Sequence, residues 1–245
     1  MKPKPPPPGC PWALFLDFDG TLVELAAHPD HVEVNERLRE VLARLRRLQA
    51  GALALVSGRS IASLDGLLAP MTLPLAGVHG LERRDARGHI HRPAGAVDRL
   101  AALRRTLDGF IAERPGLFYE DKHLALAVHY RAAPQHAGEL ERFLRRALHE
   151  LGNGFQLQTG KAVFEVRPAG ADKGSAVRAF MAEPPFAGRL PVFAGDDRTD
   201  EDAFAAVNAL GGISVRVGDG RPTAARYELA DVEETLAWLS QTPKH

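Results

Sequence analysis

Five short apolar runs along the chain are each followed by a polar or glycine-rich break and then by residues with helical periodicity. The runs predict strands at Ala13–Leu16, Ala52–Val56, Leu73–Gly77, Leu190–Ala194 and Ile213–Val217. Continuous apolar runs of this length are typical of strands buried on both faces, and their alternation with helices is typical of a parallel sheet with crossover helices. The pattern therefore predicts an α/β core with a doubly wound, mostly parallel sheet.

Apolar residues recur at helical spacing between these runs. One predicted helix, Asn35–Leu48, has Leu38, Val41, Leu42, Leu45 and Leu48 on one face. With the strands on either side it makes a strand–helix–strand unit. Further helices are predicted at Ser60–Leu68, Asp200–Leu210 and Glu233–Leu239.

The middle of the chain has a different pattern. Val97–Ala112 and Gln135–Leu151 have the spacing of amphipathic helices, whereas residues 117–131 and 155–168 each have the pattern of two strands joined by a tight turn. We therefore expect a separate α+β domain, residues 84–168, inserted into a core made of residues 13–83 and 169–245. Residues 1–12 are rich in proline, and we expect them to form a disordered leader.

Composition narrows the classes of function. Lys plus Arg and Asp plus Glu number 31 each, so no net charge attracts nucleic acid or an anionic membrane. Cys10 is the single cysteine, which excludes an intrachain disulfide and a zinc site built on cysteines and favours a reducing, cytoplasmic compartment. No apolar stretch approaches the ~20 residues that span a bilayer, and prolines stand where a secretion signal has its apolar run.

Polar residues that could carry chemistry follow three of the predicted strands. Asp17 and Asp19 follow the first, Ser57 to Arg59 follow the second, and Gly195 to Glu201 follow the fourth. Lys173 begins a predicted helix just before that fourth strand. Because ligands bind at the carboxyl ends of parallel strands, we expect these groups to converge on one crevice.

The combination suits phosphoryl transfer from a monoester. Asp17, Asp196 and Asp197 supply the oxygen ligands that Mg²⁺ prefers. One carboxylate can attack phosphorus to give an aspartyl phosphate, while the carboxyl two residues away protonates the leaving oxygen. In an extended chain Asp17 and Asp19 share a face, Gly20 provides the turn and Thr21 a hydroxyl. Ser57 and Lys173 would hold the phosphoryl oxygens.

Each motif taken alone also fits a purely structural role. An Asp-x-Asp-Gly sequence can be a loop with helix-capping aspartates, and residues 195–204 can be a well-capped helix start. The first motif is not a calcium loop, because Gly20 comes two positions early. Residues 154–162 are not a phosphate-binding P-loop, because the glycine spacing is one too long and Ala162 lacks a hydroxyl. The four signals together, each at a strand end or helix start, favour the phosphatase interpretation.

The same residues resemble the four motifs of the haloacid dehalogenase superfamily, and the Gly-Asp-Asp-x-Thr-Asp-Glu form of the last motif is similar to that of the trehalose-6-phosphate phosphatases. The resemblance extends from about Leu14 to Leu239. It implies a Rossmann-like core, with Asp17 as nucleophile and Asp19 as general acid and then base. It also implies Mg²⁺ on Asp17, the Asp19 carbonyl and Asp196, with Asp197 and Asp200 close by.

Motif spacing indicates where a specificity domain, or cap, would be inserted. Asp19 and Ser57 are 57 − 19 = 38 residues apart, whereas Ser57 and Lys173 are 173 − 57 = 116 residues apart. The long gap resembles that of superfamily members with large α/β caps, and such a cap would exclude water from the crevice. Its polar residues should then contact the sugar. The expected contacts are Glu120, Lys122, His129, Arg131, Glu165 and Arg167, in addition to Thr21, Gly58, Arg59, His79 and Glu82 near the crevice.

These contacts have a simpler alternative, a charged sheet face exposed to solvent. His89 and His91 fit a solvated strand better than a metal site, since no third ligand is evident.

The resemblance implies a Mg²⁺-dependent phosphatase that hydrolyses trehalose 6-phosphate through an aspartyl phosphate and that could dock with a trehalose-6-phosphate synthase. The same chemistry on sucrose 6-phosphate or a mannosyl phosphate remains an alternative, since only the cap discriminates them. A catalytically silent sugar-phosphate sensor is a further alternative. The presence of both Asp17 and Asp19 argues against it, because a binding protein needs no acid beside a nucleophile.

Overall fold

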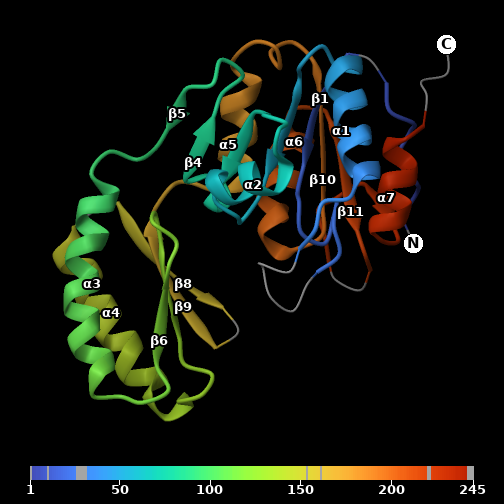
Figure 1. The fold of residues 1–245 in the computed structure, drawn as a ribbon. Coiled ribbons are helices and arrows are strands. Elements are labelled where there is room, and N and C mark those ends of the chain that lie inside the picture. Colours follow the sequence, from blue (N-terminus) through green and yellow to red (C-terminus); the bar gives the residue numbers. More distant parts are fainter. Residues whose placement is uncertain are drawn as a thin grey trace. The chain divides into compact units, whose positions relative to one another are not determined.

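The computed structural model describes residues 2–9, 11–25, 32–152, 154–160, 162–219 and 222–241. The chain divides into two compact units (Figure 1). The core unit comprises residues 1–91 and 172–245, and the insert unit comprises residues 92–171.

The core unit is built on one eight-stranded sheet with the order β12-β11-β10-β1-β2-β3-β4-β5. The first six of these strands are mutually parallel, and β4 and β5 are antiparallel to their neighbours. The doubly wound, mainly parallel sheet predicted from the apolar runs is therefore confirmed. The strands are β1 (Trp12–Leu16), β2 (Leu53–Val56), β3 (Leu75–Gly77), β4 (Glu82–Arg84), β5 (Ile90–His91), β10 (Leu190–Gly195), β11 (Ile213–Val217) and β12 (Tyr227–Leu229).

The centre of this sheet is apolar on both faces. Strand β1 pairs with both β10 and β2, and its alternate residues enter different apolar clusters. Leu14 and Leu16 pack into the apolar cluster on one face, whereas Ala13 and Phe15 pack into the apolar cluster on the other face. A strand that is buried on both faces has no polar positions, which explains the uninterrupted apolar run.

Helices cover both faces of the sheet (Figure 1). Four of them begin at a side chain that accepts a hydrogen bond from the backbone three residues on, namely Asn35, Ser60, Asp172 and Asp231. The helices are α1 (Glu36–Leu48), α2 (Ile61–Leu68), α5 (Lys173–Met181), α6 (Glu201–Ala209) and α7 (Val232–Leu239). None of the helices in the described residues is long and apolar enough to cross a bilayer.

The unit boundaries lie a few residues from the expected ones. The sequence predicts the first boundary after Arg83, but β4 and β5 continue the core sheet as far as His91. These strands have three and two residues and carry polar side chains, so they leave no apolar run to detect. The short edge strand β12 is absent from the sequence prediction for the same reason.

The insert unit is a four-stranded antiparallel sheet with the order β6-β7-β9-β8 and two helices against one face. Leu126, Val128, Phe164 and Val166 point toward those helices and form the core of the unit. Both predicted hairpins and both predicted helices are present. The elements are α3 (Ala96–Ala112), β6 (Phe118–Asp121), β7 (Leu126–His129), α4 (Ala137–Leu151), β8 (Phe155–Gly160) and β9 (Val163–Pro168).

The proline-rich leader differs from the disordered segment that the sequence predicts. The Pro3 carbonyl accepts a hydrogen bond from the backbone of Glu228 in edge strand β12, at 3.1 Å. The Pro6 carbonyl accepts one from the indole of Trp238 in α7, at 2.7 Å, and Lys4 pairs with Glu234 in the same helix. Prolines lose little entropy on ordering and have free carbonyl groups, so a proline-rich segment can dock as well as remain disordered.

Deleting residues 2–9 should therefore destabilise the core unit. The indole of Trp238 would lose its acceptor, and the edge of β12 would be uncovered. We expect the free energy of unfolding to fall by about 2 kcal/mol, which corresponds to a melting temperature about 4–8 °C lower. Thermal and urea denaturation would measure it. Lys4→Ala, which removes one exposed ion pair, should change stability by less than about 1 kcal/mol. An unchanged melting temperature in the deletion would favour the disordered leader.

Candidate active site

The candidate site is centred on a buried lysine between two buried carboxylates. Asp17 follows β1, and its backbone N–H donates to the carbonyl of Ala194 in β10 at 2.9 Å. Lys173 is the first residue of α5, and its Nζ lies 2.9 Å from Asp17 Oδ2 and 2.6 Å from Asp200 Oδ1. Lys173 and Asp17 are 2% and 4% exposed, and Asp200 is fully buried. The structure thus brings together residues from three separate motifs.

Burial and charge act in opposite directions on these groups. Burial raises the pKa of Asp17 well above its ordinary value, the charge of Asp200 adds to the rise, and Lys173 opposes it. Burial lowers the pKa of Lys173, but the charges and hydrogen bonds of Asp17 and Asp200 raise it above its ordinary value overall. Lys173 is therefore held as a cation, and the carboxylates around it need more positive charge than it supplies.

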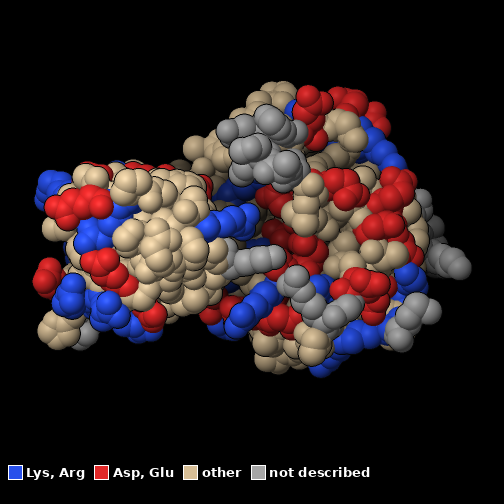
Figure 2. Space-filling view, turned by 90° about the horizontal axis from the view of Figure 1, so that it is seen from below, with Lys and Arg blue, Asp and Glu red and all other residues tan. Residues whose placement is uncertain are grey.

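The acidic residues can hold a divalent cation. Asp17, Asp196 and Asp200 each place one carboxylate oxygen within 4.8 Å of the others. Oxygen-only donors fit a hard cation such as Mg²⁺. Burial, and then the charge of Asp200, raises the pKa of Asp196 to about 6. A cation in this cluster would offset that excess of negative charge. Figure 2 shows acidic side chains gathered on one face of the core unit, with basic side chains beside them.

A glycine turn brings the first and last motifs together. Gly20 has a φ of 74°, and a Cβ at this position would collide with the carboxylate of Asp196. The hydroxyl of Thr21 lies 3.4 Å from Asp196 Oδ1. Thr21 itself is fully buried, so a direct contact with substrate stays a prediction.

Asp19 lies outside the acidic cluster. Both of its carboxylate oxygens accept hydrogen bonds from Arg59, at 2.7 Å and 2.8 Å, in a two-pronged ion pair. The side chain of Arg59 is largely buried and lies 5.7 Å from the ring of Phe18. Arg59 therefore holds the Asp19 carboxylate, and the contact of Arg59 with substrate that the sequence suggests stays a prediction. Metal ligation by the Asp19 carbonyl stays a prediction.

The second motif is buried beneath the turn that follows β3. The side chain of Ser57 is 1% exposed, and its Oγ accepts a hydrogen bond from the backbone of Arg59 at 3.1 Å. The imidazole of His79 lies against Gly58. Glu82 is 3% exposed, and its carboxylate accepts the backbone N–H of Ile61 at 2.7 Å, at the start of α2. This contact gives Glu82 a structural role, and sugar contacts by His79 and Glu82 stay predictions.

Asp197 also lies outside the acidic cluster. It precedes a short 3₁₀ turn, Arg198–Asp200, and exchanges capping hydrogen bonds with Asp200. Its backbone N–H donates to Asp200 Oδ2 at 2.9 Å. Asp197 therefore orients Asp200, whose other oxygen faces Lys173.

Four of the expected sugar contacts lie on the face of the insert sheet that the helices leave open. Lys122 pairs with Glu165 at 3.1 Å, and His129 lies 3.7 Å from Glu120. These four side chains form the open face of the insert unit.

The other two expected contacts are placed differently. Arg131 lies two residues beyond the end of β7, although the predicted hairpin includes it, and its contact with the sugar stays a prediction. Arg167 is 4% exposed, and its guanidinium donates to Gln158 Oε1 at 3.1 Å and to the carbonyl of Ala171. Its hydrogen bonds therefore stabilise the insert unit.

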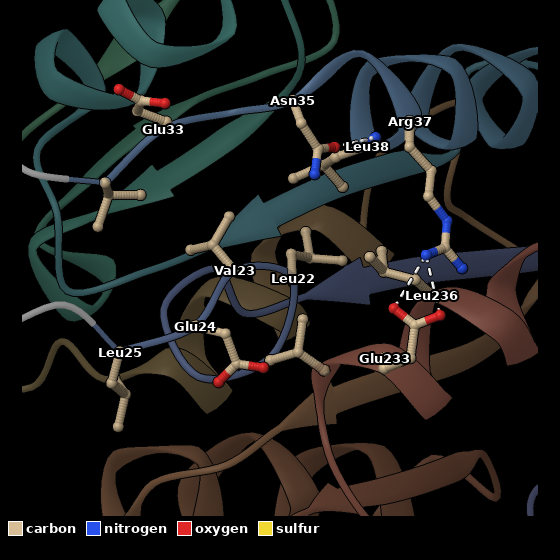
Figure 3. A pocket seen from close by; sticks show the side chains of 12 residues that line it. Leu22, Val23, Glu24, Leu25, Glu33, Asn35, Arg37, Leu38, Glu233 and Leu236 are labelled. Carbon is tan, nitrogen blue, oxygen red and sulfur yellow. Dashed lines mark hydrogen bonds and ion pairs between the residues drawn. The ribbon is translucent and has the colours of Figure 1, made fainter.

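Two other features of the core unit do not belong to the site. His89 and His91 both lie beside Asp85 at the β4–β5 hairpin, at 3.3 Å and 3.0 Å, and both are well exposed. A cavity of about 390 Å³ lies behind Leu22 and Val23, with Arg37 and Glu233 paired at its rim (Figure 3). None of the clustered aspartates lines this cavity.

Comparison with known proteins identifies the group to which this chain is similar. The sequence model of the trehalose-phosphatase family matches residues 15–233. The chain is 47% identical to a trehalose-6-phosphate phosphatase of Escherichia coli K12, over 93% of this chain and 85% of that protein. A solved structure of Aspergillus fumigatus trehalose-6-phosphate phosphatase superposes with a TM-score of 0.70 at 29% identity, over 93% of this chain and 90% of that one.

Another relative is named as a bifunctional enzyme. The chain is 36% identical to a bifunctional trehalose-6-phosphate synthase/phosphatase of Thermoproteus tenax, over 93% of this chain and 31% of that protein.

Stabilisation by Mg²⁺ should depend on pH through Asp196. Its pKa in the folded chain is about 6, above the ordinary 3.8, because the folded chain favours the protonated carboxyl. Without a cation, the contribution of Asp196 to the free energy of unfolding therefore increases as the pH falls from 6 toward 4. The carboxylate form, present above pH 6, is the one that binds Mg²⁺. We expect Mg²⁺ affinity to fall about tenfold per pH unit below 6. Thermal unfolding with and without Mg²⁺ at pH 7.5 and 5.0 would measure this.

Two asparagine variants serve as a matched pair for this experiment. Asp196→Asn should abolish the stabilisation by Mg²⁺, whereas Asp197→Asn should retain most of it, since Asp197 lies outside the cluster. Equal stabilisation of the wild-type chain at both pH values, or its persistence in Asp196→Asn, would contradict the assignment.

Proposed function

The chain belongs to the trehalose-phosphatase family, and from that premise we propose that it hydrolyses trehalose 6-phosphate to trehalose and inorganic phosphate. It is a phosphoric monoester hydrolase of the haloacid dehalogenase type. The observation that carries the proposal is the position of Asp17, which pairs with Lys173 and shares the acidic cluster with Asp196 and Asp200, in a chain 47% identical to a named trehalose-6-phosphate phosphatase.

Asp17 is the nucleophile in this proposal. Its carboxylate attacks phosphorus, the bond from phosphorus to the sugar oxygen breaks, and an aspartyl phosphate forms. Attack requires the carboxylate form, which burial opposes and Lys173 favours. Mg²⁺, held by Asp17 and Asp196, would supply further positive charge there. Lys173 then stabilises the negative charge of the transferring phosphoryl group.

Asp19 carries the proton in both halves of the reaction. It protonates the departing sugar oxygen, and it then accepts a proton from the water that attacks the aspartyl phosphate. The two hydrogen bonds from Arg59 fix the plane and direction of the Asp19 carboxylate. We place Arg59 in an orienting role on this basis.

The open face of the insert unit is proposed to bind the disaccharide. Acceptors and donors lie side by side on three neighbouring strands and just beyond the end of β6, on Glu120, Lys122, His129 and Glu165. Such pairs match the hydroxyl groups of a polyol, which both donate and accept hydrogen bonds. This face also decides between trehalose 6-phosphate and other phosphosugars, which share the same ester chemistry.

The proposal also includes a protein partner and a cellular compartment. The Thermoproteus tenax relative carries synthase and phosphatase in one chain, which supports docking of this chain with a trehalose-6-phosphate synthase. The single cysteine supports a reducing compartment, and we propose the cytoplasm.

Asp17→Asn should abolish hydrolysis of trehalose 6-phosphate and of p-nitrophenyl phosphate, because the amide cannot attack phosphorus. We expect kcat to fall by at least about 1000-fold. Phosphate release at saturating substrate would measure it, with melting temperatures as a check on folding. A variant that kept a tenth of the wild-type kcat would show that Asp17 is not the nucleophile.

Glu120→Ala or Glu165→Ala should separate recognition from chemistry. Loss of a sugar contact removes binding energy that orients the ester, so kcat/KM for trehalose 6-phosphate should fall by roughly 10- to 1000-fold. Hydrolysis of p-nitrophenyl phosphate, which has no sugar, should stay within a few-fold of wild type. Glu141→Ala, at an exposed ion pair on α4, is the control and should leave both activities unchanged. Equal loss of both activities at unchanged stability would contradict sugar recognition by these residues.

A further inference from the structure

The turn after β3 has an unusual backbone conformation. Val78, His79 and Gly80 have φ angles of 48°, 53° and 96°, all in the left-handed region. This region is strained for residues with a Cβ, and most of all for a β-branched one such as Val78. Strain of this kind persists only where the surrounding structure imposes it, and it is concentrated at functional sites. The contacts that impose it should therefore show what it is for.

One side of the turn is fixed to the Ser57–Arg59 loop. The backbone N–H of Val78 donates to the carbonyl of Arg59, and that of His79 donates to the carbonyl of Ser57, both at 2.9 Å. The imidazole of His79 fills the space above Gly58, where a Cβ would lie 2.6 Å from Cε1. The turn therefore contacts three consecutive residues of this loop, Ser57, Gly58 and Arg59.

The other side of the turn contacts the start of α5. A Cβ on Gly80 would lie 2.5 Å from the backbone oxygen of Asp172. Asp172 caps α5 and directly precedes Lys173, which pairs with Asp17 and Asp200. The backbone of Gly80 therefore approaches the lysine helix too closely for any other side chain.

We propose that the strained turn Gly77–Glu82 is a positioning element, which sets the separation between Ser57 and Lys173 so that both hold the same phosphoryl group. The proposal rests on the proposed function, since it concerns the phosphate site of that reaction. It assigns His79 a packing contact with Gly58, in place of a contact with the sugar. It also explains why Gly58 and Gly80 are glycines, since a Cβ at Gly58 would collide with the ring of His79 and a Cβ at Gly80 would collide with the backbone of Asp172.

Two glycine substitutions of the same backbone type test the proposal. Gly80→Ala adds a Cβ against Asp172, whereas Gly88→Ala adds one at a similar φ of 90° with no atom within 4 Å. Both place alanine in the left-handed region and should lower the melting temperature by a few degrees, and Gly80→Ala should lower it further because its Cβ also meets the backbone of Asp172. Gly80→Ala alone should weaken the binding of inorganic phosphate, measured by calorimetry in Mg²⁺, by about tenfold or more. It should lower kcat for trehalose 6-phosphate and p-nitrophenyl phosphate by similar factors.

A second set of variants tests the side of the turn that contacts the Ser57–Arg59 loop. These variants test the proposal even if Gly80→Ala does not fold. Gly58→Ala should displace the ring of His79 and weaken phosphate binding. The double variant Gly58→Ala/His79→Ala has room for the new methyl group, so it should bind phosphate more tightly than Gly58→Ala alone. This recovery is a coupling that independent effects on stability would not produce.

Three results would overturn the proposal. They are wild-type phosphate affinity in folded Gly80→Ala, a double variant no better than Gly58→Ala, and a His79→Ala variant that loses activity on trehalose 6-phosphate alone. If the wild-type protein hydrolysed neither ester, the proposed function would fail. The comparison of phosphate affinities would still test the turn in that case.

Discussion

The structure of the core unit depends on one buried lysine. Lys173 is enclosed by the carboxylates of Asp17 and Asp200, and no unpaired charge could be kept at this depth without a large cost. The three groups come from the end of β1, the start of α5 and the 3₁₀ turn between β10 and α6, so the pairing is possible only when the sheet and these two helices are in register. In the central strands β1, β2 and β10, every residue is uncharged, and the charged residues of the site follow only after the strand has ended.

The charge in this site is unbalanced. Within the cluster, Asp17, Asp196 and Asp200 carry three potential negative charges against the single ammonium of Lys173. The pKa values of Asp17 and Asp196 are both raised, which shows that the folded chain favours additional positive charge at this point. If each carboxylate were paired with a basic side chain, the folded state would be more stable, but the site would no longer attract a metal ion. The unbalanced negative charge therefore lowers the stability of the fold and favours the binding of a cation.

Much of this could be predicted from the sequence, because long apolar runs and motif order determine the sheet. Periodicity predicts the buried strands and most helices, and the rule that strand ends meet predicts the convergence of Asp17, Lys173 and Asp196. Contacts between polar side chains are harder to predict. The sequence suggests a substrate contact for Arg59, but it does not show the ion pair between Arg59 and Asp19, which depends on the geometry of the loop. Strands such as β4 and β5 are held by pairing with a neighbour and carry no apolar signal of their own.

Arg167 shows why alternation along a strand is a weak guide to function. It follows Glu165 by two residues and shares its face of β9, so the pattern alone predicts equal access to a ligand. The strand ends at Pro168, however, and the chain then turns so that the carbonyl of Ala171 lies within reach of the guanidinium. Ala171 is bonded directly to Asp172, the residue that caps α5 and precedes Lys173. Arg167 thus stabilises the segment that connects the insert unit to α5. A basic residue at this position therefore has a structural role that does not depend on binding a sugar.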